Sequence, residues 1–203
     1  MRDAGIGYVK MSDRRPSTLA ARDSTKRLLL AMRGLPDRLL RRRRHFAARE
    51  RLARMNRPRS VLVVCYGNVC RSPYLEAVLK RAMPDVRVAS AGFVRPGRSV
   101  PPFALAVSAQ RGFDLSKFRS RPLVAAVVRD VELIVVMDAH QARYIERFFG
   151  VPRTRIFVAG DLDPVPSASR AILDPWQQPK EAFVSSFDRL ERCAAMLVSL
   201  LAR

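Results

Sequence analysis

Hydrophobic and polar positions follow two different rhythms along the chain after residue 58. Short continuous apolar runs, rich in β-branched residues and bounded by turn residues, predict four buried strands, at 61–65, 86–90, 133–137 and 156–159. Apolar positions spaced by three and four predict helices over 72–83, 102–111 and 139–149, and a last helix near the C-terminus. Strands that alternate with helices predict an α/β fold with three layers, in which a four-stranded parallel sheet carries helices on both faces.

The last helix has the clearest period in the chain. Its apolar stripe comprises Phe183, Phe187, Leu190, Ala194, Leu197 and Leu201. Cys193 lies beside this stripe, and we interpret it as a small buried hydrophobic residue rather than a reactive thiol.

The N-terminal part of the chain has a different pattern. Residues 1–23 show no period and are predicted to be disordered. Residues 24–55 place apolar residues at helical spacing among many arginines, and Gly34 and Pro36 are expected to divide them into two helices. We therefore divide the chain into a partly disordered, partly helical extension over 1–57 and a domain over 58–203.

Charge sharpens this division. The chain has 203 residues and a net charge of +20, and residues 1–60 contribute +13 of it, with 18 Lys and Arg against 5 Asp and Glu. A basic amphipathic segment over 24–55 is compatible with contact to an anionic membrane, to nucleic acid or to an acidic partner, and also with a solvated arm that binds nothing specific. Translation from Met55, which would make the extension an artefact of gene calling, is a further alternative.

Several function classes are disfavoured by composition. No apolar run approaches the length of a membrane span, and no secretory signal is visible at the N-terminus. Three cysteines are too few for a disulfide scaffold, and their odd number fits a reducing compartment, so we expect a cytoplasmic protein. Two histidines and scattered acids offer no metal-ligand spacing, so no metal and no cofactor are expected.

The segment most suited to chemistry follows the first predicted strand, where residues 65–73 read CYGNVCRSP. Cys65 ends the strand, and the loop after it can turn its backbone N–H groups inward as a nest for a tetrahedral oxyanion. Gly67 would permit backbone angles that a Cβ forbids. Arg71 supplies a planar fork for two phosphate oxygens, and the positive field favours the thiolate of Cys65. Ser72 could donate a hydrogen bond to the sulfur.

Residues 61–73, VLVVCYGNVCRSP, closely resemble the signature loop of the low-molecular-weight protein tyrosine phosphatases. The resemblance continues through SAG at 90–92, GFDLS at 112–116, VMD at 136–138 and DPW at 174–176. It covers nearly all of residues 60–203 and none of the extension.

The resemblance implies a two-step hydrolysis of a phosphomonoester. Cys65 would attack phosphorus and form a phosphocysteine intermediate, while Arg71 and the loop amides stabilise the transition state. Asp174 would protonate the leaving oxygen and then activate water. The substrate would be a tyrosine-phosphorylated protein, and the predicted substrate- and phosphate-binding residues are Tyr66, Gly67, Asn68, Val69, Cys70, Ser72 and Trp176. The family also implies that Cys70 is a redox partner that can form a reversible disulfide with Cys65.

A second Asp-Pro pair competes for the role of acid. Asp163 also precedes a proline, and this dipeptide is common in turns. Asp174 is preferred because Trp176 follows it, where the family carries an aromatic residue that flanks the substrate ring. Asp163 is the second choice. Asp138 is interpreted as the cap of the following helix.

Two departures from the family pattern concern the surroundings of the loop. Many bacterial members carry a histidine near Lys117 or Phe118 that supports the phosphate site, and this chain has none there. Tyr66 replaces a small or aliphatic residue after the nucleophile, which would reshape the rim of the pocket.

Three alternative functions remain open. Arsenate reductases of this fold need extra cysteines on a mobile segment, which disfavours them here. Protein-arginine phosphatases of the fold carry a threonine where this chain has Val69, whose apolar side chain better suits an aromatic leaving group. The third alternative is a non-catalytic module that binds anionic partners through the basic extension.

Overall fold

The computed structural model describes residues 40–202, and its centre is a parallel sheet. The four strands are β1 (Ser60–Cys65), β2 (Arg87–Gly92), β3 (Leu133–Val136) and β4 (Ile156–Val158), in the order β2-β1-β3-β4. All pairs are parallel, and β1 lies between β2 and β3. The four predicted strands are thus confirmed.

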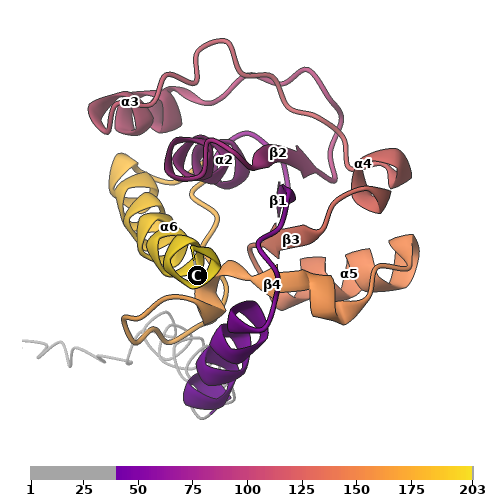
Figure 1. The fold of residues 1–203 in the computed structure, drawn as a ribbon. Helices are drawn as coiled ribbons and strands as arrows, with labels where there is room; N and C mark the ends of the chain where they lie inside the picture. Colours follow the sequence, from indigo (N-terminus) through magenta and orange to yellow (C-terminus); the bar gives the residue numbers. More distant parts are fainter. Residues whose placement is uncertain (1–39, 203) are drawn as a thin grey trace, which may run out of the picture.

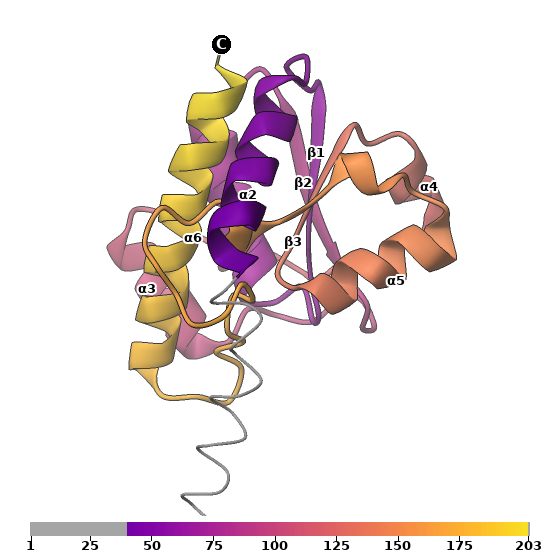
Figure 2. The same ribbon diagram turned by 90° about the horizontal axis from the view of Figure 1, so that it is seen from below.

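Helices cover both faces of this sheet, which makes the predicted three layers (Figure 1). One layer contains α2 (Arg71–Ala82), α3 (Pro102–Gln110) and α6 (Lys180–Leu201), and the other contains α4 (Ala125–Arg129) and α5 (Ala139–Phe149). Figure 2 shows the two layers on either side of the strands from below. Helix α4 was not predicted, because five residues are too few to show a helical period.

The core has two parts because successive strand residues face opposite layers. Val61, Val63 and Cys65 face the layer of α2 and α6, whereas Leu62 and Val64 face the layer of α4 and α5. The strands are buried on both sides, which explains their continuous apolar runs.

Helix α6 buries the predicted stripe against this core. Phe187 stacks on Tyr74 of α2, with ring centroids 3.9 Å apart, and this contact ties α6 to the helix that follows the cysteine loop. Cys193 is buried as predicted, and burial raises its pKa to about 12.

Residues 40–53, the last part of the extension, form a helix that lies beside β4 in the layer of α6 (indigo in Figure 1). Ala48 and Leu52 belong to the same core cluster as the strands, and Leu52 is 0% exposed. Arg51 Nη2 donates to the carbonyl oxygens of Arg153, Thr154 and Ile156, at 2.9, 3.1 and 3.0 Å. This helix is therefore packed into the domain that it precedes.

Other predictions for the extension fall on residues 1–39, including the break at Gly34 and Pro36, and lie outside the described residues. Between residues 40 and 202, no helix combines the length and apolar character that a membrane span requires. The same part of the chain contains no group of three or more His, Cys, Asp or Glu side chains placed to hold a metal ion.

Candidate active site

The cysteine loop connects the carboxyl end of β1 to the N-terminus of α2, which begins at Arg71. Because the chain continues from β1 to β2 on one side and later returns to β3 on the other, the loop lies where the strand order reverses. Crevices for ligands form at this point of open parallel sheets. The N-terminus of α2 adds partial positive charge to the loop.

The sulfur of Cys65 has a hydroxyl partner. Its Sγ lies 3.0 Å from Ser72 Oγ, and Ser72 Oγ accepts a hydrogen bond from Asn68 Nδ2 at 2.8 Å. Since Asn68 supplies the proton in that contact, the proton of Ser72 is available to Sγ. The hydroxyl of Ser72 is thus placed to donate a hydrogen bond to the sulfur.

Asn68 braces the loop from its interior. It is fully buried, its Nδ2 also donates to Ser90 Oγ at 2.8 Å, and its Oδ1 accepts from the amide of Arg121 at 2.7 Å. Its φ is +50°, so the left-handed residue of the loop is Asn68. The sequence had suggested Gly67 for this conformation. An asparagine tolerates this conformation better than most residues.

The two glycines near the loop provide space. A Cβ on Gly67 would lie 3.0 Å from Arg98 Nη1, so the missing side chain makes room for a guanidinium. A Cβ on Gly92, at the end of β2, would lie 2.8 Å from the amide nitrogen of Asn68 and from the carbonyl oxygen of Tyr66. Close contact between the loop and β2 therefore requires glycine at position 92.

A buried carboxylate supports the loop of this chain, which lacks the histidine that many bacterial members of the resembled family carry near residue 117 or 118. Glu76 Oε2 accepts from Ser90 Oγ at 2.6 Å, Oε1 accepts from Lys80 Nζ at 2.6 Å, and the carboxylate also pairs with Arg121. The support thus comes from Glu76 and Arg121 rather than from a residue near 117 or 118. Sequence reasoning missed Glu76, although a lone acid among the apolar residues of a helix was a visible signal.

Arg71 and Asp174 meet at the loop. Arg71 is buried, its Nη1 donates to the carbonyl oxygen of Ile172 at 2.8 Å, and its Nη2 pairs with the carboxylate of Asp174. Its buried Nε has no hydrogen-bond partner within residues 40–202. The Nε–H of this guanidinium is therefore available to an incoming acceptor, next to a carboxylate that can exchange a proton.

A cavity of about 370 Å³ opens above Cys65. It contains most of the predicted site and two arginines that sequence reasoning missed, and its lining is Cys65, Tyr66, Gly67, Val69, Cys70, Val94, Arg95, Arg98, Asp174 and Trp176. The guanidinium of Arg98 lies 4.9 Å from the Trp176 ring centroid, in cation–π range. The position of both arginines shortly after β2, at the sheet edge that carries the cysteine loop, was the signal that could have revealed them.

Cys70 lies in the same cavity as Cys65. Burial, followed by the charge of Cys65, raises the pKa of the Cys70 thiol well above its ordinary value. Cys70 therefore stays protonated at neutral pH, and the three cysteines form no disulfide. The redox role of Cys70 stays a prediction.

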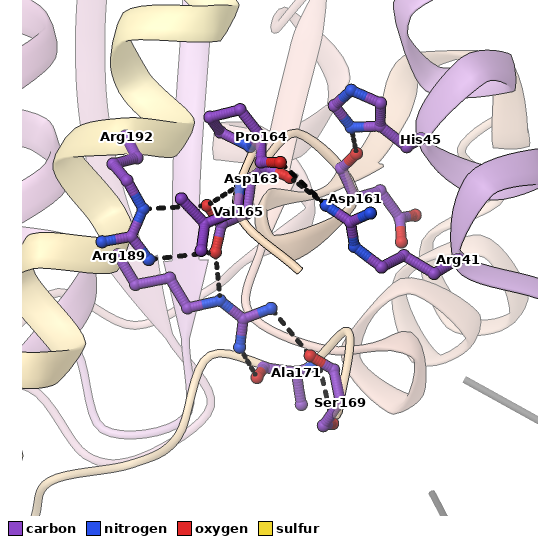
Figure 3. Close-up of polar contacts among 10 residues, drawn as sticks. All are labelled: Arg41, His45, Asp161, Asp163, Pro164, Val165, Ser169, Ala171, Arg189 and Arg192. Carbon is purple, nitrogen blue, oxygen red and sulfur yellow. Dashed lines mark hydrogen bonds and ion pairs between the residues drawn. The ribbon is translucent and has the colours of Figure 1, made fainter. Parts of the chain in front are cut away.

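The competing acid lies elsewhere. Asp163 is 2% exposed, does not line the cavity of Cys65, and forms ion pairs with Arg189 and Arg192 of α6 (Figure 3). Burial opposes ionisation, but hydrogen bonds from Arg192 and the Val165 amide and the charges of both arginines outweigh it and lower the pKa of Asp163.

Asp138 has the capping role that was predicted for it. Its Oδ1 accepts from the amide of Gln141 at 2.8 Å at the start of α5. Helix α5 ends at Gly150 with a φ of +65°, as its glycine suggested.

Comparisons with known proteins agree with this geometry. The model of the low-molecular-weight phosphotyrosine protein phosphatase family matches residues 60–203. The probable low-molecular-weight protein-tyrosine-phosphatase EpsP of Ralstonia nicotianae is 33% identical over 135 residues, which cover 66% of this chain and 90% of the relative. The Wzb phosphatase of Salmonella typhi is also 33% identical over 135 residues, covering 66% of this chain and 88% of that protein.

Solved structures give the same result. The tyrosine phosphatase AmsI of Erwinia amylovora superposes with a TM-score of 0.66 at 33% identity, covering 72% of this chain and 95% of that one. The YwlE arginine phosphatase of Geobacillus stearothermophilus superposes with a TM-score of 0.64 at 27% identity, covering 71% and 94%.

Proposed function

The chain belongs to the low-molecular-weight phosphotyrosine protein phosphatase family, and we propose that it hydrolyses phosphotyrosine in proteins with Cys65 as nucleophile and Asp174 as acid and base. Enzymes of this family are phosphoric monoester hydrolases. The observation that carries the assignment of residues is that Cys65 and Asp174 line one cavity, while Arg71, buried behind it, pairs with Asp174.

In the first step, Cys65 Sγ attacks phosphorus, and the bond from phosphorus to the tyrosine oxygen breaks. Asp174 gives its proton to that oxygen, so that a neutral phenol leaves. Arg71 and the amides at the start of α2 stabilise the negative charge on the equatorial oxygens. The products of this step are tyrosine and a phosphocysteine.

In the second step, water attacks the phosphocysteine. The carboxylate of Asp174 takes a proton from the water, the sulfur–phosphorus bond breaks, and inorganic phosphate leaves. Ser72 Oγ, 3.0 Å from Sγ, donates to the departing thiolate and makes it a better leaving group. Asn68 holds Ser72 in this position.

The walls of the cavity support an aromatic substrate. Val69, Tyr66 and Trp176 present apolar and aromatic surface around Cys65, and no carboxylate other than Asp174 lines the cavity within the described residues. A guanidinium leaving group would need acceptors along its length, whereas a phenyl ring needs flat apolar contact. These contacts favour phosphotyrosine over phosphoarginine. The need for a free Cys65 thiol also fits the reducing cytoplasm.

Hydrolysis of a phosphotyrosine peptide by the wild type and three variants tests the proposal. We expect Cys65→Ser to abolish turnover and Asp174→Asn to lower kcat by about 100-fold or more, since an acid contributes roughly that much. Asp163→Asn is the comparison variant and should lower kcat by no more than a few fold, because Asp163 does not line the cavity of Cys65. A steep loss in Asp163→Asn with none in Asp174→Asn would transfer the acid role to Asp163, and faster hydrolysis of phosphoarginine by the wild type would overturn the substrate class.

Contact of residues 24–55 with an anionic membrane or nucleic acid remains a separate proposal. Arg42, Arg43 and Phe46 are exposed on the side of the helix that faces away from the domain. Because Leu52 is buried, removal of the whole segment would also damage the core. Arg42→Gln with Arg43→Gln in the full chain is the cleaner test, and unchanged salt-dependent binding to anionic vesicles and to nucleic acid would contradict the proposal.

A further inference from the structure

The segment that connects β4 to Asp174 contains a loop whose first and last residues, Gly160 and Arg170, are in contact. A Cβ on Gly160 would lie 1.9 Å from the carbonyl oxygen of Arg170, so the backbones at these two positions are in direct contact. Asp161 and Arg170 form an ion pair across the same base. Residues 160–170 therefore form a loop whose two ends are held together, and the chain continues from its second end to Asp174.

Arg189 of α6 joins this loop to the acid (Figure 3). Its Nε donates to Asp163 Oδ2 at 2.9 Å, its Nη1 to the carbonyl oxygen of Ala171 at 2.7 Å and its Nη2 to that of Ser169 at 2.7 Å. All three of its nitrogens are thus engaged by a segment that ends three residues before Asp174. The planar fork of arginine holds such a group of acceptors in one geometry.

The next residue continues the connection to the catalytic cavity. Ile172 accepts from Arg71 Nη1 at 2.8 Å through its carbonyl oxygen, and its amide donates to the carbonyl oxygen of Met137 at 2.9 Å. The segment of residues 169–172 is consequently held by Arg189 through the carbonyl oxygens of Ser169 and Ala171, and by Arg71 through that of Ile172.

The helix of residues 40–53 holds the opposite side of the same loop. Arg41 Nη2 donates to the carbonyl oxygens of Pro164 at 2.9 Å and Asp163 at 3.3 Å. His45 Nδ1 lies 2.8 Å from the carbonyl oxygen of Asp161, and since a carbonyl only accepts, the histidine donates. Figure 3 shows these side chains reaching the loop from the helix while Arg189 and Arg192 reach it from α6.

We infer that Arg189 is a positioning residue for Asp174, that Asp163 orients Arg189, and that the helix of residues 40–53 supports this arrangement from outside residues 60–203, which the phosphatase family model matches. The inference rests on the proposed role of Asp174. Displacement of a catalytic group by about 1 Å can cost on the order of 100-fold in rate, so contacts three residues from the acid matter for proton transfer. Asp163, from the second Asp-Pro pair, thus helps to position the acid Asp174 indirectly, through Arg189.

Aryl phosphates with a graded series of leaving-group pKa values separate positioning from general stability. Unsubstituted phenoxide is a poor leaving group and needs the proton of Asp174. A phenoxide with strongly electron-withdrawing substituents leaves without that proton. Asp174→Asn should therefore lower kcat/KM most for phenyl phosphate and least for the most activated ester. The slope of this loss in kcat/KM against the pKa of the leaving group is the reference for every other variant.

Arg189→Gln should share this slope. We expect its kcat/KM to fall by about 10-fold for phenyl phosphate and by about 2-fold or less for the most activated ester. Arg192→Gln is the matched control, because Arg192 also pairs with Asp163 but donates to no carbonyl of residues 169–171. Its kcat/KM should stay within about 2-fold of the wild type for both substrates.

An equal fall for all esters in Arg189→Gln, no fall at all, or the same slope in Arg192→Gln would overturn the inference. Arg189→Lys, which keeps the charge beside Asp163 without the fork, provides a second variant and should show a smaller slope of the same sign. Urea unfolding of each variant gives its folded fraction. If the wild type does not hydrolyse the esters, or if Cys65→Ser does, the proposed function fails instead.

A double variant tests the share of the N-terminal helix. Arg41→Gln with His45→Gln should lower kcat/KM for phenyl phosphate by about 3-fold while sparing the activated ester. Arg49→Gln with Arg54→Gln changes exposed residues at the end of the same helix and should leave both values unchanged. If kcat/KM showed the same dependence on leaving-group pKa in both double variants, the helix would not contribute to positioning Asp174.

Discussion

Leu52→Ala tests whether the helix of residues 40–53 is part of the folded unit. Leu52 is 0% exposed and packs in the main core cluster, where truncation of leucine to alanine costs about 2–5 kcal/mol. With a urea m-value of about 2 kcal/mol/M, a loss of about 3 kcal/mol lowers the midpoint by about 1.5 M. Urea unfolding followed by circular dichroism measures this shift.

Phe46→Ala on the same helix is the control. Phe46 is 66% exposed, and alanine has the higher helix propensity, so its unfolding free energy should change by no more than about 0.5 kcal/mol. Equal midpoints for the two variants would show that the helix does not pack on the domain. A large shift in Leu52→Ala alone would show that a chain beginning at Met55 lacks a stabilising core residue.

Three further predictions concern the cavity and its support. Arg98→Gln should raise KM for a phosphotyrosine peptide with acidic neighbours about 5-fold more than for a neutral peptide, as expected for a loss of about 1 kcal/mol in a surface charge contact; equal changes would contradict this. Asn68→Ala and Asn68→Gly should both lose most of kcat/KM, but the alanine variant should be less stable by about 1 kcal/mol, because only glycine tolerates the φ of +50° without strain; equal stability would refute the strain. The lowered pKa of Asp163 stabilises the fold above the ordinary carboxyl pKa of about 4, and this contribution disappears as pH falls through the folded-state value; unfolding midpoints of the wild type should therefore drop more steeply than those of Asp163→Asn between about pH 5 and 3.

The cysteine loop could be predicted from sequence because its determinants are local. A strand, a short loop and a helix start follow one another within residues 60–73, and their geometry follows from their order. Even here one detail was wrong. The left-handed conformation falls on Asn68 rather than Gly67, because the side chain of Asn68 has partners on both sides, at Ser72 and Ser90.

The roles of the two Asp-Pro pairs depend on contacts that sequence does not reveal. Arg189 and Arg192 are three residues apart and share a face of α6, which their spacing predicts. Their partner Asp163 is 26 and 29 residues away, and nothing local links it to them. The helix of residues 40–53 presents the same difficulty, since a basic amphipathic pattern fits a lipid surface as well as the side of β4.

The only tryptophan of the chain is Trp176, two residues after Asp174 and 40% exposed at the mouth of the cavity. Intrinsic fluorescence excited at the red edge of protein absorption therefore originates from a single indole, with a guanidinium 4.9 Å from its ring. Titration with inorganic phosphate or vanadate can then be followed optically in the unlabelled protein, and the same emission reports on any movement of the segment that bears the acid.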